Sequence, residues 1–148
     1  MERAQGFVPV RTVTAAEVTA FAGCTGDLGR LYMDRELAAR GPFGATVAPP
    51  MLCFCLGFGS WLREFLRSPL PGDEASAGHL GDRWELLAPV FPGDTLEVRH
   101  RALGLRRTRS RPTQGVLTFG LQILNQRERP VMHGEVDMML QMRPAAGG

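Results

Sequence analysis

The apolar stretch from Met51 to Leu66 constrains the fold more than any other part of the sequence. Only two charged residues interrupt it, and Pro50 before it suits the first turn of a helix, where a missing backbone N–H costs little. An apolar helix of this kind must be buried on most of its sides. Gly57 and Gly59 each weaken it by about 1 kcal/mol relative to alanine. We therefore expect another element, such as a sheet wrapped around the helix, to pack closely against its backbone at these glycines.

The second half of the chain alternates apolar and polar residues with the period of two that is typical of strands. A strand and a turn are expected in residues 79–94, and longer strands in residues 95–105, 115–124 and 130–142. Residues 125–129 supply a hairpin turn, and residues 68–78 are predicted to form a loop. Helices followed by long antiparallel strands around one apolar helix predict an α+β fold.

Two short helices are expected before the apolar one. Thr14 and Glu17 have the T-x-x-E spacing of a capping box, in which each side chain satisfies a backbone N–H at the helix start. Gly23 and Gly26 are expected to end this helix and turn the chain. Asp34 is an acceptable N-cap for the second helix, which a Gly-Pro pair ends.

Composition predicts a single domain spanning residues 1–148, because this length can bury one substantial core. Hydrophobic residues make up 44% of the chain and charged residues 22%, which is ordinary for a soluble globular protein. The sequence has no apolar run of about 18 residues and no signal-peptide pattern at its start. We therefore expect a cytoplasmic protein with no membrane partner.

The charge pattern argues against nucleic acid as the main partner, since the formal net charge is only +2. All 17 basic residues are arginine, and they concentrate in the stretch from Arg99 to Pro112. This stretch is predicted to be either a solvated strand face with a hairpin turn, or a surface for a phosphorylated ligand or an acidic carrier protein.

The three cysteines suit a reducing compartment and show no metal-binding spacing. Cys24 would need a basic neighbour to act as a nucleophile, and none is evident in the sequence. We expect no metal, no cofactor and no covalent catalysis.

Four segments, in order, resemble the MaoC-like hydratase/dehydratase family, whose hotdog fold wraps a curved antiparallel sheet around a long helix. They are "TAAEVTAFAGCTGD" with "MDRELAA", "FGATVAPPML", "LLAPVFPGDTLEV" and "GVLTFGLQILNQRERPVMHGEV". The resemblance covers nearly the whole chain. It implies that an acyl thioester of coenzyme A or of an acyl carrier protein binds at the interface of a hotdog dimer, which we expect to be a homodimer, with a heterodimer as the alternative.

The family signature G-D-x-N-P-x-H is only half present. Gly26 and Asp27 match it, whereas Gly29, Arg30 and Tyr32 stand where the family has asparagine, proline and histidine. In the family the aspartate and the histidine hold the catalytic water. The resemblance therefore implies that Asp27 is a site residue and leaves the role of the histidine to be filled.

Hydration of an enoyl thioester needs a base that takes a proton from water, an acid that protonates C2, and donors to the thioester oxygen. Asp27 on its turn is the predicted base, and its alternative role is to cap the turn. Tyr32 is a poor proton shuttle because its reference pKa is about 10. As a neutral phenol it can instead donate a hydrogen bond, and its alternative is an ordinary half-buried aromatic.

Further substrate-binding candidates surround the start of the apolar helix. Family members often place a glycine N–H there against the thioester oxygen, but Pro50 has no N–H, so the N–H of Met51 or Leu52 is expected to serve. Phe54 belongs to a cluster of aromatic residues that forms either an apolar pocket or plain core. Among the histidines, His79 is the candidate to replace the missing one, while His100 and His133 are predicted to be structural.

Three functions remain open on this sequence. The first is a hydratase or dehydratase of enoyl or 3-hydroxyacyl thioesters with an atypical Asp27 and Tyr32 site. The second is a hotdog protein that carries out a cyclisation or another non-hydration step on a free polyketide-like ligand in natural-product biosynthesis. The third is a non-catalytic subunit of a heterodimeric dehydratase.

Overall fold

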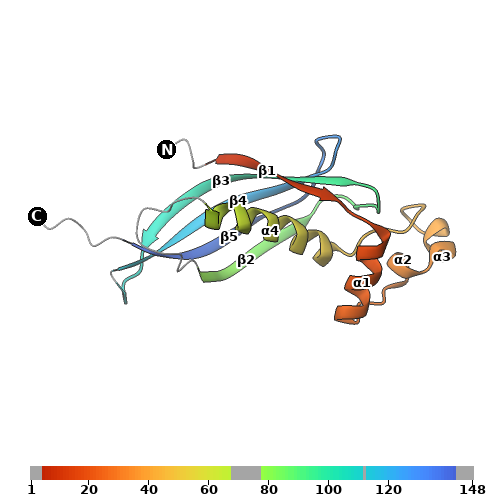
Figure 1. Cartoon of the computed structure of the whole chain (residues 1–148), viewed down its shortest axis with the longest axis horizontal. Coiled ribbons are helices and arrows are strands. Elements are labelled where there is room, and N and C mark those ends of the chain that lie inside the picture. Colours follow the sequence, from red (N-terminus) through yellow and green to blue (C-terminus); the bar gives the residue numbers. More distant parts are fainter. Residues whose placement is uncertain (1–4, 68–77, 112, 143–148) are drawn as a thin grey trace, which may run out of the picture.

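A single antiparallel sheet organises the computed structural model, which describes residues 5–67, 78–111 and 113–142 (Figure 1). Its strands are β1 (Gln5–Thr12), β2 (Gly78–Leu86), β3 (Thr95–Arg107), β4 (Gln114–Leu124) and β5 (Pro130–Gln141). They pair in the order β1-β3-β4-β5-β2, each antiparallel to its neighbour. Among the described residues, β1 and β2 are therefore the two edges of the sheet.

The apolar helix α4 (Pro50–Arg67) lies along one face of the sheet, which curves around it (Figure 1). Three short helices, α1 (Ala15–Thr25), α2 (Arg30–Met33) and α3 (Arg35–Arg40), gather at one end of the sheet beside the start of α4 (Figure 1). This is the predicted α+β hotdog fold, which the structure confirms. Residues 68–77 of the predicted loop lie outside the described residues, and its last residue, Gly78, is the first residue of β2.

Helix α4 packs tightly against the sheet at Gly57. A β-carbon on Gly57 would lie 2.5 Å from Ile123 Cδ1 and 3.5 Å from Val98 Cγ2. The predicted close packing at this glycine is confirmed. A β-carbon on Gly59 would meet nothing within 4 Å, so the same prediction was wrong for Gly59, which lies on the exposed side of the helix.

Period-two alternation decides which side chains reach α4. In β3, Leu96 and Val98 are 2% and 0% exposed, whereas the next residue, Arg99, is on the other face and is exposed. Trp61 of α4 is buried against the same face, with its ring centroid 5.1 Å from that of Phe119. The sheet therefore has one apolar face under α4 and one polar face away from it.

Helix ends follow the predicted capping chemistry with one exception. Both hydrogen bonds of the capping box between Thr14 and Glu17 are present, and Asp34 caps α3 by accepting a bond from Leu37 N at 2.9 Å. Gly26 ends α1 in the left-handed conformation, with φ 75°. The prediction that Gly23 helps to end the helix was wrong, because Gly23 lies inside α1.

Sequence patterns did not predict two elements. Strand β1 precedes the helices, so the expected order of helices first and strands second needs this correction. Helix α2 has only four residues, too few to show a helical period. No helix within the described ranges is both long enough and apolar enough to cross a membrane.

The two glycines of α4 give a matched test of how the sheet packs. Gly59→Ala should raise the free energy of unfolding by up to about 1 kcal/mol, because alanine favours helix and the position is open. Gly57→Ala gains the same propensity but forces the buried Ile123 to move, at a cost of about 1–3 kcal/mol. Urea unfolding should therefore rank Gly59→Ala above Gly57→Ala. Equal stabilisation by both substitutions would contradict the close contact.

Candidate active site

A pocket of about 310 Å³ lies at the helical end of the sheet. Its wall comes from α2, the segment before α4, the start of α4, the end of β2 with the turn after it, and the start of β5. Nearly all lining side chains are apolar, and the Tyr32 hydroxyl and the Cys53 thiol are the polar groups among them. Such a lining suits a ligand with an apolar chain and a few polar atoms.

Backbone hydrogen bonds hold the walls of this pocket together. Val47 N donates to Leu31 O at 3.1 Å, which fixes α2 to the segment that leads into α4. Ala48 N donates to Val90 O at 2.7 Å, which fixes the same segment to the turn after β2. The position of Tyr32 relative to the start of α4 is therefore set by the backbone.

Asp27 and Tyr32 lie close together on either side of Gly29. A β-carbon on Gly29 would lie 2.6 Å from Tyr32 Cε2 and 3.4 Å from Asp27 Oδ1. The absence of a side chain at position 29 is thus what lets the tyrosine ring lie here. The structure brings together the two residues predicted to be catalytic; Tyr32 lines the pocket, whereas Asp27 is not among the lining residues.

Burial raises the pKa of the Tyr32 hydroxyl, and the negative charge of Asp27 raises that pKa further. The phenol therefore keeps its proton at neutral pH and acts as a hydrogen-bond donor. The Asp27 backbone N–H donates to Thr25 Oγ1 at 3.2 Å. Its carboxylate has no hydrogen-bond partner among the described residues, which leaves both oxygens available to a water or a ligand.

The first turn of α4 offers one unused backbone donor beside the pocket. Leu52 N donates to Pro49 O at 3.0 Å, and the Leu52 side chain is buried in the core. No described residue accepts a hydrogen bond from Met51 N, and Pro50 lines the pocket without an N–H to give. Of the predicted donors to a substrate oxygen, Met51 is the one whose N–H is free.

Phe54 and His79 lie away from this pocket. The Phe54 ring is partly buried against the hydrophobic core and packs on Phe58 and Trp84, with centroids 5.5 Å and 5.1 Å apart. His79 stands at the far end of β2 from the pocket, where its Nε2 lies 3.1 Å from Asp82 Oδ2. Within one chain, the structure does not bring His79 to Tyr32.

The other histidines have structural surroundings. His100 lies under α4 near Trp61 and Phe119, and burial lowers its pKa, so it stays neutral. Its Nδ1 is buried with no hydrogen-bond partner. His133 lies on the outer face of the sheet, 2.9 Å from Glu85 Oε2.

Cysteine chemistry is not favoured at the pocket. Cys53 lines it, but burial raises the pKa of its thiol to about 12, so it is not a thiolate at neutral pH. Cys24 and Cys55 are exposed free thiols. In the part of the chain that the structure describes, no group of three acidic, histidine or cysteine side chains could hold a metal ion.

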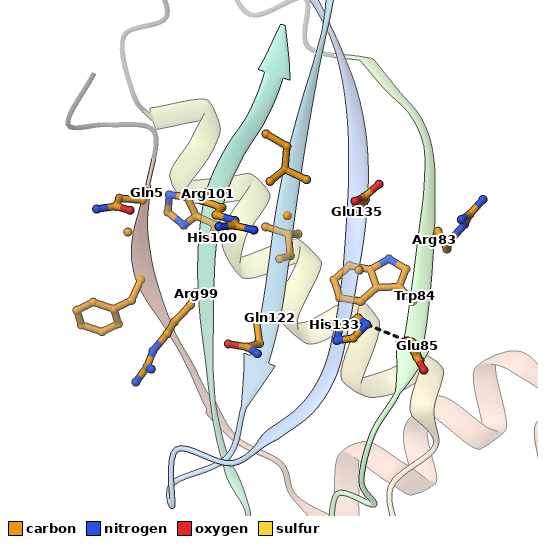
Figure 2. A pocket seen from close by; sticks show the side chains of 16 residues that line it. Gln5, Arg83, Trp84, Glu85, Arg99, His100, Arg101, Gln122, His133 and Glu135 are labelled. Carbon is orange, nitrogen blue, oxygen red and sulfur yellow. Dashed lines mark hydrogen bonds and ion pairs between the residues drawn. The ribbon is translucent and has the colours of Figure 1, made fainter.

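A larger hollow of about 890 Å³ lies on the face of the sheet away from α4. Figure 2 shows side chains of both charges along it, among them Arg99, Arg101, Glu85 and Glu135. Its lining is mixed in polarity, and Tyr32 and Pro50, which line the smaller pocket, are not among its residues. The smaller apolar pocket is therefore the better candidate active site.

The arginine-rich stretch lies along β3 and the hairpin after it. Arg99 donates to Glu97 Oε1 at 3.0 Å and to Glu128 Oε1 at 2.8 Å, so it belongs to a surface ion-pair network. Arg101, Arg106 and Arg109 are exposed. The predicted role of this stretch in binding a phosphorylated ligand or an acidic carrier protein stays a prediction.

Sequence reasoning missed the far wall of the pocket. Leu86 and Leu87, at 57% and 42% exposure, line it together with Val131 and Met132. Two adjacent leucines at a strand end, followed by alanine and proline, break the alternation of a half-buried strand. This irregularity was the available signal that the segment faces a ligand site.

The chain has clear relatives. A family model described as FAS1-like, dehydratase domain region matches residues 8–134. The protein YdeM of Bacillus subtilis is 27% identical over 128 residues, which cover 86% of each chain. The 3-hydroxyacyl-thioester dehydratase Z of Mycobacterium tuberculosis is 44% identical over 45 residues, or 30% of each chain.

Among solved structures, the MaoC-like dehydratase from Rhodospirillum rubrum superposes with a TM-score of 0.78 and 26% identity, covering 95% of this chain and 92% of that one. The family model spans most of the chain, and the hotdog architecture agrees with it. The chain therefore belongs to the FAS1-like dehydratase domain family, among the MaoC-like dehydratases.

Proposed function

We propose that this protein is a hydratase or dehydratase of enoyl and 3-hydroxyacyl thioesters, carried on coenzyme A or on an acyl carrier protein. The observation that carries the proposal is the Asp27 carboxylate, which has no hydrogen-bond partner among the described residues and lies beside the protonated Tyr32 at the apolar pocket. The similarity of the chain to a 3-hydroxyacyl-thioester dehydratase supports the choice of substrate class.

In the hydration direction, Asp27 takes a proton from water as the water oxygen bonds to C3. The electrons of the C2–C3 double bond move toward the thioester carbonyl, whose oxygen gains charge. The Met51 N–H and the Tyr32 hydroxyl are the proposed donors to that oxygen or to the water. A proton delivered to C2 completes the addition, and dehydration reverses these steps.

The acting unit is proposed to be a homodimer. Strand β2 is an edge of the sheet, with Leu80 and Leu86 exposed at 51% and 57%. An edge strand with exposed apolar side chains is a template for pairing with another strand. Size-exclusion chromatography with light scattering should give twice the mass of the chain, and a heterodimer would require a second gene product.

A second candidate function is a cyclisation or another non-hydration step on a free polyketide-like ligand. The observation that favours it is Tyr32, which stands in place of the family histidine and whose raised pKa makes it unfit to shuttle protons. An apolar pocket of about 310 Å³ has room for a compact ligand without a pantetheine arm.

Removal of the proposed base is the direct test. Purified protein should hydrate crotonyl-CoA or a longer enoyl thioester, measured by the loss of absorbance of the conjugated thioester. Asp27→Asn should lower kcat by about 10²–10⁴-fold, because proton abstraction from water is lost. Glu36→Gln, a nearby exposed carboxylate on α3, is the matched control and should leave kcat unchanged.

An inactive wild type that binds a partner with an intact signature would instead identify a non-catalytic subunit. An inactive homodimer that retains a free ligand would favour the second candidate. Equal activities of wild type and Asp27→Asn would contradict the proposed role of Asp27.

The geometry around Gly29 predicts a coupled pair of substitutions. Gly29→Asn alone should displace the Tyr32 ring, since even a β-carbon would lie 2.6 Å from it, and should lower both stability and activity. Adding Tyr32→His to this variant puts a smaller ring beside position 29 and restores the family residues at both positions. The double variant should therefore be more stable than Gly29→Asn alone and hydrate faster than wild type. Strictly additive effects in the double-mutant cycle would show that the two positions are not in contact.

A further inference from the structure

An imidazole and a carboxylate form a pair on β2 that the pocket of the same chain does not use. His79 Nε2 lies 3.1 Å from Asp82 Oδ2, and the His79 ring packs against Phe58 with centroids 4.8 Å apart. The side chains of the pair are 37% and 27% exposed, so both still reach solvent. A carboxylate that orients an imidazole in this way is a common arrangement for proton transfer.

This pair and the pocket wall lie on the same face of the same strand. In the sheet register, His79, Asp82 and Leu86 stand opposite Met138, Val136 and Met132 of β5, all of which are buried under α4. Leu86 lines the pocket, whereas His79 lies at the other end of β2. One strand thus carries the pocket wall at one end and the acid–base pair at the other.

The outer edge of β2 is suited to a second copy of this chain. It has no strand beside it among the described residues, so its outward backbone N–H and C=O groups are open to pairing. Asp82 and Glu85 are already paired, with His79 and His133. Exposed Leu80 and Leu86 would be covered if the same strand of a second copy paired with it.

Two-fold pairing of two β2 strands is antiparallel, so the start of one strand meets the end of the other. A two-fold axis near the middle of β2, around Asp82 to Trp84, sets Leu86 of one copy beside the partner's His79 and Asp82. Leu86 and the His79–Asp82 pair of the second copy then lie on the helix side of the joined sheet, where the pocket opens.

We propose that the His79–Asp82 pair of one copy completes the pocket of the other and is its missing proton donor. This inference rests on the proposed hydratase function and adds a residue from the second copy. Asp27 takes the proton from water, oxygen bonds to C3, and the partner's His79 delivers a proton to C2. The proton on Asp27 returns to the imidazole through solvent, so the cycle closes with no other reactant.

Complementation between inactive variants tests this arrangement. Asp27→Asn and His79→Asn should each lower kcat by at least tenfold as homodimers, while the thermal unfolding midpoint shows that both remain folded. A mixed dimer contains one chain of each variant. The pocket of the His79→Asn chain then has its own intact Asp27 and receives an intact His79 from the Asp27→Asn chain. After subunit exchange at equal amounts, about a quarter of the wild-type activity should return, because about half of the dimers are mixed and each has one complete site.

The matched control mixes Asp27→Asn with Tyr32→Phe. These positions belong to the same pocket of one chain, so a mixed dimer has no complete site and activity should not return. Full activity of the His79→Asn homodimer, or no recovery in the mixture with Asp27→Asn, would overturn the inference.

A cross-link separates this inference from the function it rests on. The exposed Cys24 and Cys55 are first replaced by serine, and His79→Cys and Leu86→Cys are then added. The two new thiols lie about 23 Å apart along one strand, so they cannot form a disulfide within one chain. Across two paired copies they lie side by side. Oxidation should therefore give a covalent dimer. If the covalent dimer forms but the wild type is inactive, the proposed function and the proton-donor role are both overturned. If the cross-link fails but the wild type is active, only the shared site is overturned.

Discussion

The approach of α4 to the sheet at Gly57 is the contact on which the rest of the structure depends. Because this residue has no side chain, Ile123 and Val98 reach the helix backbone, and the sheet can curve around the helix instead of standing off from it. Trp61 then fills the next turn against Phe119. The packing of the helix in turn sets where its first turn lies relative to the sheet. Backbone hydrogen bonds from Val47 and Ala48 hold the segment before this turn against α2 and against the turn after β2. The candidate active-site pocket is therefore a consequence of how the helix packs, and its walls are held by the backbone.

Much of this architecture could be predicted because strong periodic signals carry it. The apolar run gave α4, alternation gave β3, β4 and β5, and the capping residues Thr14 and Asp34 gave the starts of α1 and α3. Strand β1 was missed because its alternation is broken by Pro9 and its inward side chains are few. The roles of individual glycines were harder to assign, since Gly57 contacts the sheet and Gly59 does not, although both weaken the helix equally. Only tertiary packing distinguishes them.

The candidate site could be predicted only where residues lie close in the sequence. Asp27 and Tyr32 belong to one turn, and they meet in space as a local motif should. The far wall at Leu86 and Met132 comes from β2 and β5, whose ends reach the pocket through sheet register. Leu52 shows the opposite failure, because its position in the first turn suggested a free N–H that the structure has already paired with Pro49. Whether a backbone donor is free depends on the geometry of the turn, which residue types alone do not specify.

The substitution of tyrosine for histidine changes what the pocket must obtain from elsewhere. A phenol whose pKa is raised by burial and by Asp27 can donate a hydrogen bond but cannot give up and regain a proton at neutral pH. The pocket wall of a single chain therefore offers the Tyr32 phenol, with the Asp27 carboxylate next to that residue, but no imidazole. His100 is half-buried beside Trp61 and Phe119, and His133 lies on the outer face of the sheet (Figure 2), and neither lines the pocket. His79 is the histidine that stands on the pocket side of an edge strand, and only a second copy of the chain can bring it to the site.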